Sequence, residues 1–103
     1  MAHEVFAYGE FEKEPVLRRV LGRVPEQVPA KLRGFRKFHD DLLGYYNLVH
    51  DEDGVVEGQL LLAVTDDELL ALDRFESAMY RRGVVTVETP TGPHEAWVYR
   101  GKA

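Results

Sequence analysis

The sequence predicts an α+β fold, namely a small mixed sheet or partly closed β-barrel of about six strands with two helices. Short apolar runs separated by glycine, proline and acidic residues predict the strands. Two further segments repeat their apolar residues at helical spacing and predict the helices. Because 103 residues suit one domain, we expect a single domain over residues 1–103.

The first part of the chain predicts a strand and a helix. Residues 5–8 form an apolar run that leads into a loop at Gly9. A helix is expected between Pro15, which suits a first helical turn, and Gly22, which can end a helix. Residues 23–29 contain two prolines and predict an extended connector.

The middle of the chain predicts three strands. Residues 30–38 alternate between apolar and polar side chains, and Gly34 is a candidate bulge. An aromatic strand is expected at residues 44–49 and a central apolar strand at residues 55–64. The polar residues 50–54 end in glycine, so they predict a hairpin or tight connection between these two strands.

The last part of the chain predicts a helix and two strands. Thr65 followed three residues later by Glu68 has the spacing of a capping box, which predicts a helix that runs to about Glu76. The acidic first turn also suits the positive end of a helix dipole. Strands joined by a proline-containing turn are expected at residues 80–88 and 95–100.

Composition excludes several classes of function. The chain has no cysteine, so disulfides, thiolate metal sites and cysteine nucleophiles are excluded. A net charge of −5 argues against nucleic acid as a partner, because nucleic acid is itself negatively charged. A basic cluster at Lys31, Arg33, Arg36 and Lys37 is expected to be the solvated face of a strand.

No apolar run approaches the ~20 residues of a membrane span, and the first residues do not resemble a secretory signal. We therefore expect a cytoplasmic protein that does not enter membranes.

Two acidic segments that contain histidine are candidate metal-binding sites. Residues 39–41 and 50–53 both carry a histidine beside carboxylates, but neither has the helical histidine pair of a zinc site. We therefore expect no metal and no cofactor. Ser77 is the only serine in the chain and follows Glu76 directly, which argues against a serine triad.

Glu76 is the candidate catalytic residue. Leu69 and Leu72 share one face of the expected helix, and Glu76 falls on the same apolar stripe four residues after Leu72. The carboxylate should therefore point inward or into a cleft. Burial and the negative end of the helix both raise the pKa of such a carboxylate, which makes it a better base.

Glu76 has two structural alternatives, and another residue competes with it. It could be a partly exposed glutamate at the end of a helix, or it could form an ion pair with Arg81 or Arg82. Asp73 lies four residues after Leu69, so it also borders the apolar stripe and competes for the catalytic role.

The loop at residues 8–11 is a candidate binding element. A strand that ends in Gly9 exposes backbone N–H groups, and glycine permits other groups to approach closely. Such N–H groups can hold a carboxylate or an oxyanion. The alternative is an ordinary turn at the end of a strand.

Taken in order, these segments resemble the γ-glutamylcyclotransferase-like family, in particular its small avirulence-induced-gene-like and γ-glutamylamine cyclotransferase-like domains. Residues 5–11 resemble the family's opening strand and its Tyr-Gly-Thr/Ser-Leu substrate loop, and residues 72–76 resemble its Leu-Asp-x-x-Glu signature. Further similarities cover the Gly-Tyr strand, the Val-x-Gly-x-Leu strand and the final strands, at residues 44–49, 56–60, 80–82 and 96–99.

The resemblance implies the family fold and its reaction. The α-amine of a γ-glutamyl amine or peptide would attack its own γ-carbonyl, releasing 5-oxoproline and the free amine. Glu76 would be the general acid/base. The implied substrate-binding residues are Tyr8, Gly9, Glu10, Phe11, Tyr80 and Tyr99. A small γ-glutamyl substrate is the implied partner.

Three residues in two segments depart from the family pattern. Glu10 and Phe11 replace a small hydroxyl residue and a leucine, and Ser77 replaces a glycine after the catalytic glutamate. A carboxylate at Glu10 lies where the substrate α-carboxylate is expected. It therefore favours the alternative of a catalytically inactive family member that binds a small metabolite or a protein partner.

Overall fold

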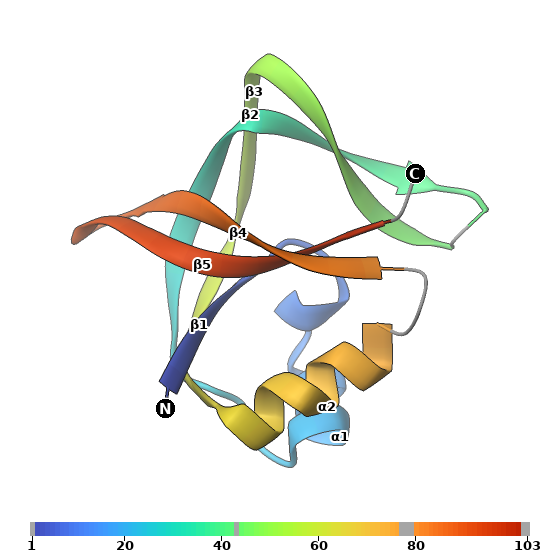
Figure 1. The fold of residues 1–103 in the computed structure, drawn as a ribbon, viewed down its shortest axis with the longest axis vertical. Coiled ribbons are helices and arrows are strands. Elements are labelled where there is room, and N and C mark those ends of the chain that lie inside the picture. Colours follow the sequence, from blue (N-terminus) through green and yellow to red (C-terminus); the bar gives the residue numbers. More distant parts are fainter. Residues whose placement is uncertain (1, 43, 77–79, 102–103) are drawn as a thin grey trace.

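The computed structural model describes residues 2–42, 44–76 and 80–101, and Figure 1 shows the arrangement of their helices and strands. In chain order the elements are β1 (Ala2–Ala7), the short 3₁₀ helix η1 (Glu10–Glu12), α1 (Glu14–Leu21), β2 (Gln27–Asp40), β3 (Tyr45–Thr65), α2 (Asp66–Glu76), β4 (Tyr80–Thr89) and β5 (Gly92–Gly101).

The strands close into a barrel in the order β1-β3-β2-β4-β5. Neighbouring strands are antiparallel, except that β1 and β5 run parallel where Val5 pairs with Trp97 and completes the barrel. The expected α+β class and barrel are therefore confirmed. The described residues form five strands and not about six.

The expected hairpin at residues 50–54 is wrong. Val49 and Val55, on either side of this segment, both pair with β2, so β3 continues through the segment as one strand. The chain does not fold back on itself here, because both halves of β3 satisfy their backbone hydrogen bonds on the same neighbour. The expected connector at residues 23–29 is also shorter, since β2 already begins at Gln27.

The turn-like composition of this segment instead builds a bulge in the β2–β3 ribbon. The register shifts on both sides of Gly34, whose φ of 87° confirms the bulge expected there. The carboxylate of Asp51 accepts the N–H of Asp53 at 3.1 Å, as in a turn. A side chain at Gly54 would place its Cβ 2.2 Å from the Phe35 carbonyl oxygen, so the two strands approach closely here.

Both expected helices are confirmed. α1 ends at Gly22 in the left-handed conformation, with φ 78°. The capping box of α2 is present, because the Glu68 N–H donates to Thr65 Oγ1 at 3.1 Å and the Thr65 N–H donates to Glu68 Oε1 at 3.0 Å. No helix in the described part of the chain is long and apolar enough to span a membrane.

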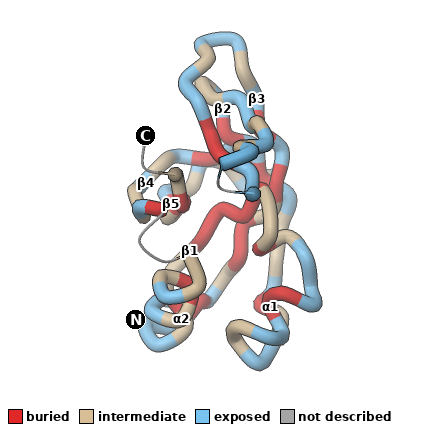
Figure 2. The backbone as a smooth tube through the Cα atoms, turned by 90° about the vertical axis from the view of Figure 1, so that its right-hand side faces the viewer, coloured by how far each residue is buried: buried red, intermediate tan, exposed pale blue. Residues whose placement is uncertain are grey.

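β1 and Tyr8, which follows it directly, contribute side chains to two hydrophobic clusters. Val5 and Ala7 pack with residues of α1 and α2, whereas Phe6 and Tyr8 pack with side chains inside the barrel. This explains why residues 5–8 form an unbroken apolar run, since both faces of the strand are buried. Figure 2 shows the second half of β1 as a buried segment above the two helices, and exposed residues at the far end of the β2–β3 ribbon.

Candidate functional site

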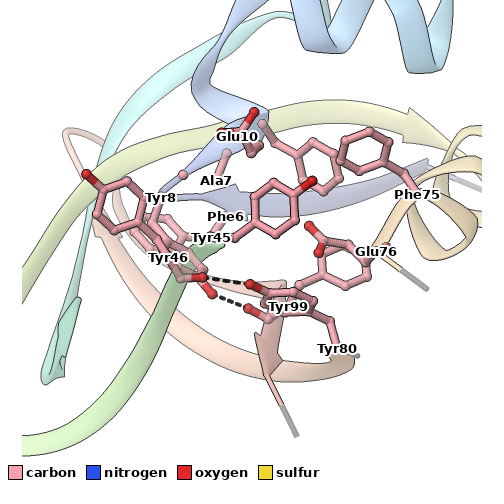
Figure 3. A pocket seen from close by; sticks show the side chains of 12 residues that line it. Phe6, Ala7, Tyr8, Glu10, Tyr45, Tyr46, Phe75, Glu76, Tyr80 and Tyr99 are labelled. Carbon is pink, nitrogen blue, oxygen red and sulfur yellow. Dashed lines mark hydrogen bonds between the residues drawn. The ribbon is translucent and has the colours of Figure 1, made fainter. Parts of the chain in front are cut away.

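A pocket of about 250 Å³ opens beside the end of β1. This volume lies close to the lower end of the roughly 300–1,000 Å³ typical of small-molecule sites. All seven candidate site residues line it, although they come from four separate parts of the chain. These residues are Tyr8, Gly9, Glu10, Phe11, Glu76, Tyr80 and Tyr99 (Figure 3).

Glu76 reaches the pocket from the last turn of α2, and its carboxylate points among the aromatic rings (Figure 3). Leu69 and Leu72, on the same side of the helix, are buried, which orients this side toward the barrel. Burial, followed by the charge of Glu10, raises the pKa of Glu76 to about 7. The carboxyl group is therefore close to half-ionised at neutral pH.

Asp73 does not line the pocket. Its carboxylate instead binds side chains of β4 and β5. Tyr99 Oη donates to Asp73 Oδ1 at 2.6 Å. Arg82 donates from Nε to Oδ1 at 2.9 Å and from Nη2 to Oδ2 at 3.3 Å. Arg82 is therefore paired with Asp73 and not with Glu76, and Arg81 is exposed. Among the candidate carboxylates of α2, Glu76 is the one that faces the pocket.

The loop after β1 forms the short helix η1. The first hydrogen bond of this turn runs from the Glu12 N–H to the Gly9 carbonyl at 3.0 Å. The N–H groups of Gly9, Glu10 and Phe11 precede that bond and have no partner within the turn. At the pocket edge, the Glu10 carboxylate accepts a hydrogen bond from Lys13 Nζ at 3.0 Å.

Phe11 forms part of the wall and leaves the pocket open. It is 4% exposed, and its ring packs against Phe75 with a centroid distance of 5.4 Å and against Tyr99 with one of 5.8 Å. This packing links the loop to both α2 and β5.

The hydroxyl groups of two tyrosines in the pocket wall donate to backbone carbonyl oxygens. Tyr8 Oη donates to the Tyr99 carbonyl oxygen, and Tyr80 Oη donates to the Tyr46 carbonyl oxygen at 3.0 Å. Burial is the main reason that the pKa of Tyr80 rises to about 12, and burial also raises the pKa of Tyr8 and Tyr99. These side chains are therefore neutral wall residues at physiological pH.

Five lining residues were not among the candidates, namely Phe6, Ala7, Tyr45, Tyr46 and Phe75. Phe75 adjoins Glu76, and Phe6 and Ala7 precede the loop, so their places in the sequence gave a usable signal. Tyr45 and Tyr46 reach the pocket only because the β2–β3 ribbon bends over it. No local pattern marks that contact.

The basic cluster lies on β2 and is exposed. Lys31 and Arg36 lie 4.0 and 3.7 Å from the carboxylates of Glu57 and Asp51, and Arg33 pairs with Glu88. Lys37 Nζ instead donates to the Tyr8 carbonyl oxygen at 3.2 Å. Among the described residues, no group of three or more histidine or carboxylate side chains could hold a metal ion.

Comparisons with known proteins all indicate the same protein family. The family model described as "Gamma-glutamyl cyclotransferase, AIG2-like" matches residues 5–103. AIG2-like protein C of Arabidopsis thaliana is 40% identical over 86 residues, which cover 84% of this chain and 50% of that protein. A Methanocaldococcus jannaschii protein, named as a gamma-glutamylcyclotransferase and candidate RNase, is 33% identical over 103 residues, covering 97% of this chain and 46% of that protein.

Solved structures show the same fold. A solution structure of an Arabidopsis thaliana protein superposes with a TM-score of 0.87 at 36% identity, covering 96% of this chain and 68% of the other. A structure titled gamma-glutamyl cyclotransferase superposes with a TM-score of 0.80 at 18% identity, covering 99% and 68% of the two chains, and this similarity concerns the fold alone. The chain spans about half the length of the curated relatives that it matches.

Proposed function

This chain belongs to the AIG2-like gamma-glutamyl cyclotransferase family, and from that premise we propose that it converts a γ-glutamyl amine or peptide into 5-oxoproline and the free amine. The observation that carries the proposal is the position of Glu76. Its carboxylate lies in a pocket with the loop of residues 8–11, and its pKa is about 7. A pKa near the working pH is what a group that both takes up and returns a proton requires.

The proposed reaction is an internal transfer of an acyl group. Glu76 takes a proton from the α-ammonium group of the substrate, and the resulting amine attacks the γ-carbonyl carbon. The new C–N bond closes a five-membered lactam, while the bond between the γ-carbon and the leaving nitrogen breaks. The protonated Glu76 returns the proton to that nitrogen, and its carboxylate then takes the second proton from the lactam nitrogen and passes it to the released amine, which leaves as an ammonium ion. The reaction therefore consumes no water, oxidant or reductant.

The loop supplies donors for the negative parts of the substrate. We assign the backbone N–H groups of Gly9, Glu10 and Phe11 to the α-carboxylate or to the oxyanion of the tetrahedral intermediate. The Glu10 side chain does not remove these donors. Its ion pair with Lys13 also partly balances its charge at the pocket edge.

A small site is sufficient for this chemistry, because both reacting groups belong to one molecule. Fixing the reactive conformer of an intramolecular reaction can give effective molarities of ~10⁵ M or more. A well-placed base contributes roughly 10²- to 10⁴-fold. The walls of Tyr8, Phe11, Tyr80 and Tyr99 would hold the γ-glutamyl chain in the folded conformer that the attack needs.

One observation favours a second function, which is metabolite binding without catalysis. Glu10 lines the pocket near the loop donors, where its charge opposes a substrate α-carboxylate. An inactive member of the family would keep the pocket and bind a small ligand that carries no carboxylate at this point. Binding without release of 5-oxoproline is the result that distinguishes this function.

The test is incubation of the protein with a panel of γ-glutamyl amines and peptides, with 5-oxoproline measured by chromatography. We expect product from at least one substrate, and a loss of roughly 10²- to 10⁴-fold in kcat for Glu76→Gln. The matched control is Glu57→Gln on the outside of β3, where the glutamate side chain is 80% exposed. If Glu76→Gln turns over at the normal rate while folded, the role of Glu76 is wrong.

A further inference from the structure

Asp73 is the point at which α2, β4 and β5 are joined by hydrogen bonds. Tyr99 Oη and Arg82 Nε donate to its Oδ1 at 2.6 and 2.9 Å, and Arg82 Nη2 donates to its Oδ2 at 3.3 Å. The bond from Tyr99 has the short length of an O–H donor on an ionised carboxylate, and the two bonds from Arg82 form a bidentate pair. The Asp73 carboxylate is thus held by two side chains from the barrel.

The sheet places both donors on the side that faces α2. Arg82 and Tyr99 pair directly across β4 and β5, so their side chains lie on the same face. Trp97, two residues before Tyr99, lies on that face as well, and its ring centroid is 4.1 Å from Arg82 Cζ. The guanidinium group is therefore held by a carboxylate and also by an aromatic ring.

This cluster adjoins the proposed base. Asp73 precedes Glu76 by three residues on α2, so the two carboxylates are neighbours on the helix surface. Tyr99 lies between them, because its ring lines the pocket with Glu76 while its hydroxyl binds Asp73. The charges of Asp73, Arg82 and Glu76 all act on the Tyr99 hydroxyl, whereas burial and the charge of Glu10 raise the pKa of Glu76 itself.

We propose that Asp73 is a positioning residue that sequesters Arg82: by holding the guanidinium group, it prevents an ion pair between Arg82 and Glu76. The inference rests on the proposed function, because it explains how Glu76, three residues after the carboxylate that holds Arg82, remains available as a base. Two carboxylates of one helix compete for one cation. Asp73 holds Arg82 with two hydrogen bonds, and Trp97 fixes the guanidinium group in that position.

The alternative pairing would impair the proposed chemistry. An arginine within about 4–6 Å of a carboxylate lowers its pKa by roughly 1–3 units. Glu76 would then stay ionised at neutral pH and return a proton poorly. The charged and titratable groups on α2 and on the elements packed around Glu76 are Tyr8, Glu10, Arg19, Tyr45, Tyr46, Asp73, Tyr80, Arg82 and Tyr99.

The test is an NMR titration of the Glu76 side-chain carboxyl carbon, assigned by its absence from the spectrum of Glu76→Gln. In Asp73→Asn, the amide oxygen can still accept the Tyr99 hydroxyl, but Arg82 loses its charged partner. We expect the midpoint of the Glu76 titration to fall by about one pH unit or more. The double variant Asp73→Asn/Arg82→Gln should titrate like the unmodified protein, because it has no guanidinium group to release.

Three results would overturn the proposal. The first is an unchanged midpoint in folded Asp73→Asn. The second is a Glu76 midpoint in the double variant that is as low as in Asp73→Asn. This would mean that a structural change, and not the freed Arg82, causes the shift. The third is a midpoint raised in both Arg82→Gln and the double variant, which would mean that Arg82 already acts on Glu76. A rise in Arg82→Gln alone comes from the Asp73 carboxylate, which that variant leaves without its cation.

The matched control is Glu88→Gln, which removes the carboxylate partner of Arg33 near the other end of β4. Its Glu76 midpoint should equal that of the unmodified protein. In the 5-oxoproline assay, the acid limb of kcat/KM for Asp73→Asn should shift with the NMR midpoint. An inactive protein would defeat the proposed function but leave the titration test intact, so the two failures can be told apart.

Discussion

The hydroxyl of Tyr8 donates a hydrogen bond to the backbone carbonyl of Tyr99, which lies 91 residues away in the sequence. This bond joins the end of β1, where the loop begins, to β5 at the wall of the pocket. It has a structural role and a functional consequence, because it fixes the loop relative to the strand that carries Tyr99.

We predict that Tyr8→Phe destabilises the fold by about 1–3 kcal/mol, because the buried Tyr99 carbonyl loses its donor. Urea unfolding followed by circular dichroism measures the change. Tyr45→Phe is the control, since Tyr45 is 45% exposed and its replacement should change stability by less than ~0.5 kcal/mol. Equal stability of Tyr8→Phe and the unmodified protein would contradict the importance of this bond.

Protein stability should fall as the pH rises from about 4.5 to about 7, because the pKa of Glu76 is raised from 4.5 to about 7 on folding. The folded state then binds the proton more tightly than the unfolded state. The stabilisation is complete below the unfolded pKa and is lost as the pH passes the folded one.

The comparison of the unmodified protein with Glu76→Gln isolates this contribution. At pH 4 and at pH 8, the free energy of unfolding of Glu76→Gln is compared with that of the unmodified protein. Between these pH values, the difference should change by up to about 3 kcal/mol in favour of the variant. Urea midpoints across this pH range provide the measurement. A difference that does not vary with pH would mean that Glu76 titrates normally.

Replacing Glu10 should move the pH profile of the reaction. The Glu10 charge raises the pKa of Glu76, so Glu10→Ser should lower that pKa and shift the acid limb of kcat/KM to lower pH. The same change should lower KM, because a charge that opposes the substrate α-carboxylate is removed. Glu12→Gln, a change in the same short helix at a residue that does not line the pocket, should leave the profile in place.

Gly58 should tolerate no side chain. A Cβ at this position would lie 2.3 Å from the Ala7 carbonyl oxygen and 3.0 Å from the Phe6 ring. We predict that Gly58→Ala costs about 3 kcal/mol, the upper end of the usual range for overpacking. At Gly83 a Cβ meets no described atom within 4 Å, so Gly83→Ala in β4 is the control. Thermal unfolding compares the two variants, and equal melting temperatures would refute the clash.

The local elements could be predicted from sequence because their causes lie within a few residues. The capping box of Thr65 and Glu68 and the left-handed Gly22 at the end of α1 depend on adjacent backbone groups. The apolar stripe of Leu69 and Leu72 likewise determines the face on which Glu76 lies. These features hold whatever the rest of the chain does.

The bulge at residues 50–54 could not be predicted from neighbouring residues. Aspartates followed by glycine suit a hairpin turn and a bulge equally well. The outcome depends on whether β3 pairs with itself or with β2, which is a choice between distant partners. The contacts of Tyr45 and Tyr46 with the pocket have the same origin, because they follow from the bend of the ribbon.

The sequence by itself determined an α+β chain with a glutamate on the apolar face of its second helix. The tertiary structure decided that Glu76 meets the loop of residues 8–11 and that Arg82 binds Asp73. Helix periodicity is a local property of the backbone, so it can be read from neighbouring residues. The choice of an ion pair depends on distances between strands and helices, and those distances exist only once the barrel has closed.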